Sequence, residues 1–488
     1  MRNILIYSLL TFIMFGCMVG PDYRRPAVEA SASWRFEEKE VKEMGNMAWW
    51  EQFNDPVLNQ LIQTALMENK DVMVATAKVE EFVGRYGTTR AALFPQADAG
   101  TTAGRIRTTE HGPTPLSAST ENPADNYSAF FYGSWEIDLW GKLRRATEAA
   151  RADLLGQEEG RRGVIITIVT STASAYVNLC NLDKQLDIAK RTAQSRKESY
   201  DLFQLRFTGG LISELELSQV KSEYEQALAT IPFLEKTIAQ QENALSVLLG
   251  RNPGPIIRGK KIDNLVLPAV PSGLPSDLLT RRPDIRQAEQ SLIAANARIG
   301  VARSLYFPSI SLTGMFGFTS TDLSTLFRGP SKIWSWAVPL EVPVFTGGAI
   351  GGQVKSAEAQ ERQALIRYQQ SIQTAFREVE DALIDQKRSR EELEILNRRV
   401  ESLSTYAQSA RLRFDNGYTS YIEVLDAERS LFTAELARAQ TKGVLFQSLV
   451  NLYKAMGGGW VMEGDRLTGT TTDLYKSIHG SEVMHGNQ

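Results

Sequence analysis

The stretch YSAFFYGSWEIDLW, Tyr127 to Trp140, decides the fold, because its side chains alternate in character along the chain. One set, spaced two residues apart, is apolar and aromatic: Tyr127, Ala129, Phe131, Gly133, Trp135, Ile137 and Leu139. The opposite set includes Ser128, Ser134, Glu136 and Asp138. Since successive side chains of a strand point to opposite faces, this period predicts a strand with one apolar face.

Three further segments repeat this two-residue period: Phe94 to Arg107, Phe307 to Phe318 and Ile333 to Val344. The first is the weakest, because its apolar set is little more than Ala97, Ala99 and Ala103. Strands of about 10 residues with one apolar face and terminal aromatics are typical of membrane β-barrels. Half-buried strands of a soluble sheet would show the same period, so that alternative stays open. We predict strands at about 93–107, 126–140, 305–318 and 333–345.

Four strands cannot close a membrane barrel, which needs about eight or more, and lipid does not tolerate an unpaired strand edge. The chain is therefore expected to oligomerise. Two copies would supply eight strands packed nearly solid, whereas three copies would supply twelve and leave room for a lumen. The polar connectors 108–125 and 319–332 are predicted to be the outer loops of two hairpins.

The two halves of the sequence resemble each other, which indicates an internal duplication. LFPQ at 93–96 corresponds to YFPS at 306–309, and RFTGG at 206–210 corresponds to RFDNG at 413–417. The offsets are 213 and 207 residues (306 minus 93 and 413 minus 206). We therefore expect one repeated unit with small changes in loop length.

Each half contains long tracts that are rich in helix-forming residues. The predicted helices are Asp55–Ala92, Lys142–Phe207, Leu211–Leu249, Ser276–Ser304, Gln353–Phe414 and Ser420–Met456. The two longest would extend roughly 90 to 100 Å and need lateral partners along their length. Pro232 is expected to break or kink its helix. The predicted organisation is repeat 1 at 55–265, repeat 2 at 266–460 and a partly disordered tail at 461–488.

The N-terminus has the pattern of an export signal. Arg2 precedes an apolar run from Ile4 to Phe15, which is too short to span a bilayer and is followed by Gly16-Cys17. We predict a signal peptide at 1–16 and a lipidated Cys17 that opens an N-terminal segment and equatorial region at 17–54. A plain export signal is the alternative. Only Cys180 remains, so no internal disulfide is expected, and no later segment is expected to form a transmembrane helix.

Composition and motifs exclude several classes of function. Charged residues make up 23% of the chain and the net charge is −3, so no basic surface indicates nucleic acid as a partner. The three histidines, His111, His479 and His485, have no metal-ligand spacing, and the chain lacks a nucleophile elbow or a phosphate loop. We expect no enzyme activity, no metal and no cofactor.

The helix after Gly417 carries three stripes at helical spacing. One is polar (Thr419, Glu423, Asp426, Ser430, Thr433, Gln440), and two are apolar (Val424, Ala427, Leu431, Ala434; Ile422, Leu425, Phe432, Leu436). A helix with two apolar seams packs against two neighbours, so the polar stripe faces water. In a ring of such helices Glu423 and Asp426 would project into a lumen as an acidic gate, with Glu216 as the counterpart of Glu423. Their alternative role is to complement the helix dipole.

Four segments carry a resemblance to a known family: GPDYRRP after Cys17, WWEQFNDPVLNQLI from Trp49, GLPSDLLTRRPDIRQAEQSLIAANARIGVARSLYFPSISLTG from Gly273, and LVNLYKAMGGGW near the end. The chain resembles the outer membrane factor family of TolC and OprM type efflux ducts, in its NodT-type lipoprotein subfamily. This implies an α+β membrane protein: a homotrimer whose twelve-stranded outer-membrane barrel, four strands per chain, is continuous with a long periplasmic helical barrel.

The same resemblance implies the partners: outer-membrane lipid, a periplasmic adaptor and an inner-membrane efflux pump of RND type. The turns that hold Gly209, Gly210, Asn416 and Gly417 must reverse the helices, and in the family such tips meet the adaptor. A soluble periplasmic helical adaptor is the alternative function. RRPD at Arg281–Asp284 is expected to be structural, because Pro and Asp suit a first helical turn.

One feature departs from the family. TolC-type relatives close the tip with a tyrosine and an arginine that reach an acidic residue of the other repeat. This sequence keeps Glu216 but has Phe414 and Thr419 at the partner positions, so that lock is expected to be absent. Arg413 or Tyr421 could replace it.

Overall fold

The computed structural model describes residues 18–28, 34–36, 42–43, 48–111, 121–267, 271–272 and 278–458. The chain divides into two compact units, and each draws segments from both halves of the sequence. The first unit comprises 1–27, 80–156 and 288–368, and the second comprises 28–79, 157–287 and 369–488. The predicted signal peptide, Cys17 and the tail at 461–488 lie outside the described residues.

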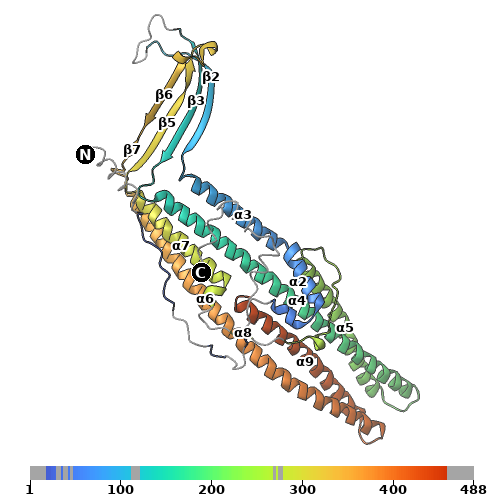
Figure 1. The fold of residues 1–488 in the computed structure, drawn as a ribbon. Coiled ribbons are helices and arrows are strands. Elements are labelled where there is room, and N and C mark those ends of the chain that lie inside the picture. The colour runs from blue at the N-terminus through green and yellow to red at the C-terminus, as the bar shows by residue number, and fades with distance from the viewer. Residues whose placement is uncertain are drawn as a thin grey trace. The chain divides into compact units, whose positions relative to one another are not determined.

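The first unit contains an antiparallel sheet with strand order β2-β3-β5-β6, visible in Figure 1. Its strands are β2 (Gln96–Ile106), β3 (Ala124–Glu136), β5 (Ser309–Ser320) and β6 (Lys332–Ala337), and β7 (Leu340–Glu341) also pairs with β5. The predicted α+β class and the four predicted strands are therefore confirmed. Their ends lie within a few residues of the predicted ones, except in the last strand.

The register of this sheet places the predicted apolar residues on one face. Phe131 pairs with Ala99 on β2 and with Phe316 on β5, and Phe316 pairs in turn with Trp334 on β6. Residues directly opposite one another in a sheet share a face, so the four predicted apolar sets coincide. Phe131 is 67% exposed and Trp334 is 65% exposed within one chain. An apolar face this open requires a cover that a single chain does not supply.

The last strand is shorter than the predicted 333–345. β6 ends at Ala337, and only Leu340 and Glu341 resume pairing, in the same register against β5. Pro339 interrupts the ladder because it has no N–H to donate, although its carbonyl accepts from Ser311 N at 3.1 Å.

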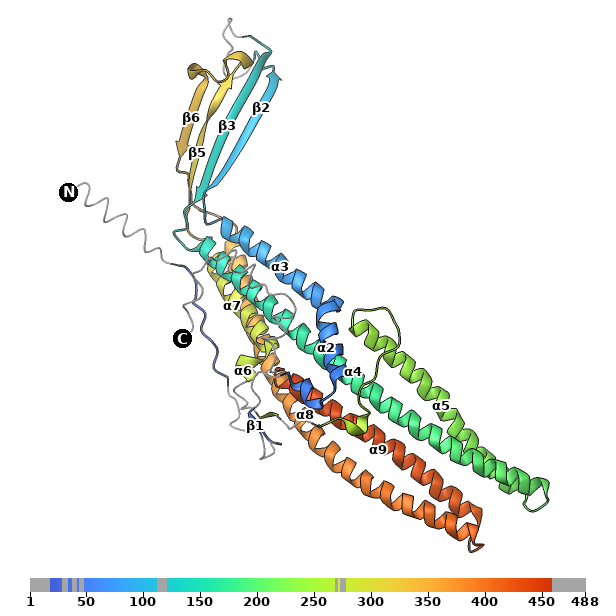
Figure 2. The same cartoon turned by 45° about the vertical axis from the view of Figure 1, so that its right-hand side comes forward.

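The long helices have close to the predicted bounds. They are α4 (Lys142–Thr208), α5 (Glu214–Leu248), α8 (Ala349–Asp415) and α9 (Tyr421–Ala455). In the second unit α5 lies beside α4, and α9 lies beside α8, as two helical hairpins (Figures 1 and 2). α5 runs through Pro232, so of the two predicted outcomes, a break or a kink, the break does not occur. Buried residues on both sides of the proline, Ala227 and Leu234, hold the helix against its neighbours.

The shorter elements complete the fold. They are β1 (Lys42–Glu43), η1 (Trp49–Phe53), α2 (Pro56–Glu68), α3 (Lys70–Ala91), η2 (Ile262–Asn264), β4 (Pro271–Ser272), α6 (Leu278–Arg281), α7 (Pro283–Ser304), η4 (Leu323–Thr325) and η5 (Gly329–Ser331). The predicted helix at 55–92 is therefore two helices. Asn69 separates them with an extended backbone, and its side chain accepts from Asp71 N and Val72 N to begin α3.

The conspicuous WWEQFND stretch builds the core of the second unit. The ring of Trp49 stacks on Tyr453 at 4.8 Å between centroids. Asp55 is fully buried, and its carboxylate accepts from Val57 N at 2.9 Å, from the Tyr176 hydroxyl at 2.8 Å and from Lys260 N at 2.9 Å. This carboxylate therefore joins the start of α2 to α4 and to the loop after α5.

The GPDYRRP stretch lies along α7 in the first unit. Val19 N donates to Trp140 O at 3.0 Å, and Gly20 approaches Gly300 so closely that a Cβ on either would collide. Tyr23 and Arg25 both donate to Glu289, at 3.0 and 2.9 Å. These contacts hold the segment that directly follows Cys17 against the end of β3 and the start of α4.

One described helix, α4, contains an 18-residue window apolar enough to span a membrane by length and composition, with a mean hydropathy of 1.5. Length and composition alone do not make it a transmembrane helix, so the expectation that no later segment forms one stays a prediction. Core packing accounts for the apolar composition of the window, because 56% of it is buried and α4 supplies Ile165, Val169 and Leu179 to the core of the second unit.

Candidate functional site at the hairpin tips

The two hairpin tips of the second unit share one turn geometry. Gly210 and Gly417 have positive φ angles of 70° and 75°. Leu211 N donates to Arg206 O at 2.9 Å, and Tyr418 N donates to Arg413 O at 2.8 Å. This is the Schellman pattern that ends a helix with a left-handed residue. Gly209 and Asn416 are not in the left-handed region; instead Asn416 donates from its side chain to Leu412 O at 2.7 Å.

The structure places each predicted gate carboxylate in a separate local contact. Glu423 accepts from Thr419 Oγ1 and forms an ion pair with Arg413 at 3.4 Å. Asp426 forms an ion pair with Arg429 at 2.8 Å, with both side chains more than half exposed. Each of these two carboxylates is paired with an arginine, so the polar stripe of α9 and its paired arginines have little net charge within one chain.

Glu216 has a capping role at the other tip. Ser213 N and Ser213 Oγ donate to its carboxylate at 2.8 and 2.9 Å, and Glu216 N donates back to Ser213 Oγ. This capping box begins α5. Hydrogen bonds from the backbone and side chain of Ser213 hold the pKa of the Glu216 carboxyl below its usual range.

The stripes on α9 agree with the predicted faces in part. The first apolar seam is buried at Val424, Ala427 and Ala434, and Asp426 on the polar stripe is exposed. The second seam is only partly covered, with Ile422 58% exposed. A seam left open in one chain fits a helix that packs against a second neighbour.

An aromatic cluster lies at the positions where TolC-type relatives have the lock that is expected to be absent here. Tyr421 lies 4.2 Å from Phe203 and 4.9 Å from Phe414 between ring centroids, and the Arg206 guanidinium lies 5.7 Å from the Phe414 ring. These contacts join the α4–α5 hairpin to the α8–α9 hairpin. Tyr421 is buried, and burial raises the pKa of its hydroxyl. Of the two suggested substitutes, Arg413 pairs with Glu423 and Tyr421 packs in this cluster.

A buried ionic network lies next to this cluster, and no motif in the sequence points to it. Arg196 on α4 is 3% exposed, donates to Glu223 O at 2.6 Å and pairs with the Glu223 carboxylate at 3.0 Å. Its guanidinium lies 5.3 Å from the Phe432 ring. Burial raises the pKa of the nearby Glu428 carboxyl, while Arg411 and Arg196 oppose that shift. Only helix rotation brings these residues together, so no local pattern identifies them.

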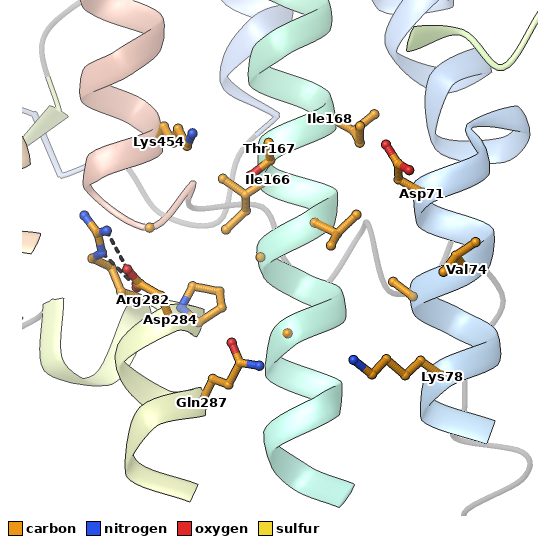
Figure 3. Close-up of a pocket in the computed structure, with 16 residues that line it drawn as sticks. Asp71, Val74, Lys78, Ile166, Thr167, Ile168, Arg282, Asp284, Gln287 and Lys454 are labelled. Carbon is orange, nitrogen blue, oxygen red and sulfur yellow. Dashed lines mark hydrogen bonds and ion pairs between the residues drawn. The ribbon is translucent and has the colours of Figure 1, made fainter. Parts of the chain in front are cut away.

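The RRPD motif borders a cavity of 620 Å³ in the second unit, among α3, α4, α7 and α9 (Figure 3). Arg282 is buried, donates to Asp284 at 3.0 and 2.7 Å, and reaches Glu378 at 2.7 Å and Ala455 O at 2.9 Å. It therefore joins the start of α7 to α8 and to the end of α9. These contacts support the expected structural role of the RRPD motif.

Comparison with known proteins identifies the family. A family model described as outer membrane efflux protein matches residues 61–251 and 274–458, which confirms the internal repeat. The chain is 35% identical over 468 residues to the probable efflux pump outer membrane protein TtgC of Pseudomonas putida, covering 94% of this chain and 96% of that protein. It is 34% identical over 454 residues to the cation efflux system protein CusC of Escherichia coli, covering 91% and 96%.

Solved structures of similar proteins have the same fold. The outer-membrane channel OprN is 29% identical with a TM-score of 0.85, covering 91% of this chain and all of that one. A crystal structure of CusC is 33% identical with a TM-score of 0.80, covering 90% of this chain and all of that one. Both the sequence match and the fold extend over nearly the whole chain. The chain therefore belongs to the outer membrane efflux protein family.

Proposed function

We propose that this chain is the outer-membrane channel subunit of a tripartite efflux system and that three copies share one pore. The observation that carries the proposal is the four-stranded sheet with one exposed apolar face. Among the described strands, β2 and β6 each have a neighbour on one side only. An open edge in lipid leaves backbone groups unsatisfied, so each β2 edge needs a β6 edge from another copy. Three chains give twelve strands and a lumen.

The cargo leaves by this pore after an inner-membrane pump and a periplasmic adaptor deliver it. The relatives' names include toluene, solvent, antibiotic and cation efflux, so the family does not select one cargo class. We propose a pump of RND type and contact of the adaptor with the two tips at 209–210 and 416–417. The turn geometry at both tips supports a shared role, because it presents two similar surfaces per chain. A soluble adaptor is not favoured, because the relatives are outer membrane proteins.

We propose that Glu423, Asp426 and Glu216 form a periplasmic gate near the pore axis, where each faces its copies in the neighbouring chains. Glu423 and Asp426 lie one helical turn apart on α9, and both are accompanied by an arginine. Glu216 supports the gate from the other hairpin while it caps α5. A ring of acidic groups with paired arginines would favour cations less strongly than bare carboxylates would.

The lipid anchor at Cys17 belongs to the same proposal, together with placement in the NodT-type lipoprotein subfamily. Residues 18–25 support it, because their contacts with Trp140 and Glu289 bring the chain to the end of β3 just after Cys17. Acyl chains attached there would enter the leaflet next to the barrel.

The test measures assembly and conductance together. The purified protein is reconstituted into a planar bilayer, and its mass is determined in mild detergent by native mass spectrometry. We expect a trimer that forms ion-conducting pores. A β-edge variant, Trp334→Pro, removes a donor from β6 and is expected to abolish both, whereas Thr433→Ala on the exposed stripe of α9 is the control. A monomer in detergent and bilayer, or a trimer without conductance, would refute the proposal.

A further inference from the structure

The face of the sheet opposite the apolar one carries two aromatic residues among its polar side chains. Phe130 and Tyr132 on β3 alternate with Phe131, so they point to the other side. Tyr132 pairs with Asp98 on β2 and with Met315 on β5. Phe130 pairs with Gly100 and Gly317. The two rings lie 5.7 Å apart between centroids.

Glycines on the flanking strands leave room for these rings. A Cβ on Gly317 would collide with the Phe130 ring, and a Cβ on Gly100 would lie 3.9 Å from Tyr132 Cε2. Both rings therefore extend over the neighbouring strands. Tyr132 is 44% exposed, and Ile333 across Gly317 is 38% exposed, so the patch is open for contact.

A carboxylate borders this patch. Asp98 is exposed and lies directly opposite Tyr132, where side chains of facing residues are about 5 Å apart at Cβ. Within the part of the chain that the structure describes, Asp98 makes no ion pair; Arg105 on the same strand is paired with Asp125. The opposite face carries the exposed Phe131 and Trp334 and suits lipid, so the face that carries Asp98 is the one that suits water. In the proposed trimer this face therefore lines the pore.

We propose that Asp98, Tyr132 and Phe130 form a contact site on the pore wall for organic cations that carry flat aromatic rings. The inference rests on the proposed pore. The negative faces of the two rings attract a cation and stack with its aromatic groups, and Asp98 supplies the opposite charge. Met315 completes the patch with a polarisable thioether. Three copies line the pore, so a passing cation meets the site on every side.

The experiment measures block of the pore in a planar bilayer by tetraphenylphosphonium, with tetraethylammonium as the cation that lacks rings. Tetraphenylphosphonium is expected to reduce the current of the unmutated protein at lower concentration than tetraethylammonium. Tyr132→Ala should raise its half-blocking concentration about two- to fivefold, the range of an exposed cation–π contact. Asp98→Asn should raise it for both cations, and more at low salt.

Two variants separate the site from general damage. Tyr132→Phe keeps the ring, so tetraphenylphosphonium should block this variant at the same concentration as it blocks the unmutated protein. Ser134→Ala changes a residue on the same face, two positions away and outside the patch, and should likewise leave the half-blocking concentration unchanged. The proposed site would be overturned, with the pore left intact, by either of two results. One is equal block of the unmutated protein by both cations. The other is the same half-blocking concentration for the unmutated protein, Tyr132→Ala and Asp98→Asn. An unmutated protein that never conducts would instead overturn the proposed function.

Discussion

Replacing Glu423 and Asp426 together with alanine should reverse the ion selectivity of the pore, rather than merely weaken it. In the structure the two carboxylates are paired with Arg413 and Arg429 at 3.4 and 2.8 Å. These four side chains sum to zero charge in each chain. The double substitution leaves both arginines without their partners, so each chain gains two positive charges at the tip and a trimer gains six, two for each of three chains.

The fold itself should be almost unaffected by this change. Exposed ion pairs contribute about 0.2–1 kcal/mol each, and both pairs lie at the surface of one chain. The thermal midpoint of the trimer should therefore change little while the electrical properties change strongly.

The assay is the reversal potential of single channels across a tenfold potassium chloride gradient. The unmutated pore should be nearly neutral to weakly cation-selective, and the double variant should favour chloride. The matched control removes both charges of one pair, Glu423→Ala with Arg413→Ala, and should keep the original sign. A double variant that stays cation-selective, with unchanged conductance, would refute the placement of these residues at the constriction.

Three further predictions follow from separate parts of the chain. Asp55→Ala leaves three buried donors without an acceptor, so unfolding should become easier by about 3–6 kcal/mol, whereas Asp55→Asn should cost less; tryptophan fluorescence during thermal unfolding checks both. Partial burial would raise the pKa of Asp263, but hydrogen bonds from Lys184 and Lys442 lower it to about 2, below the ordinary 3.8. A lowered carboxyl pKa stabilises the fold above the unfolded value, so about 1–2 kcal/mol should be lost as the pH falls from about 4 to 2, and Asp263→Asn should remove that dependence in acid unfolding curves. Cys17→Ser should abolish labelling with radioactive palmitate, and an unmutated protein that takes up no label would exclude the lipid anchor.

Much of the fold follows from the sequence where neighbours along the chain decide the structure. The alternation in Tyr127–Trp140 indicates a strand because it depends only on residues two apart, and the register later places Phe131 on the same face as Phe316. The tips at Gly210 and Gly417 are identified for the same reason, since a left-handed residue ends a helix by local hydrogen bonds. Pro339 is also visible in the sequence, and its lack of an N–H explains the early end of β6.

Local patterns were insufficient for the candidate gate. The spacing of Glu423 and Asp426 predicts that they share a stripe. The sequence does not show that each is paired with an arginine, or that the Glu216 carboxylate accepts a hydrogen bond from Ser213 N. Those choices depend on side-chain geometry at the turn. The sequence suggests Tyr421 as one substitute for the absent lock, but not its partners, because packing between two hairpins, and not spacing within one, selects them.

By itself the sequence determined the long helices, the alternating strands and the turns of this protein, because each depends on residues a few positions apart. It also determined the repeat, because the two halves can be compared directly as sequences. Only the tertiary structure decided the partners of buried charges. Arg196 on α4 forms an ion pair with Glu223 on α5, and the Asp55 carboxylate accepts a hydrogen bond from Lys260 N, 205 residues away in the sequence. The physical reason is that desolvated charges require an exact partner in space, and the rotation of packed helices, which no local pattern encodes, supplies it.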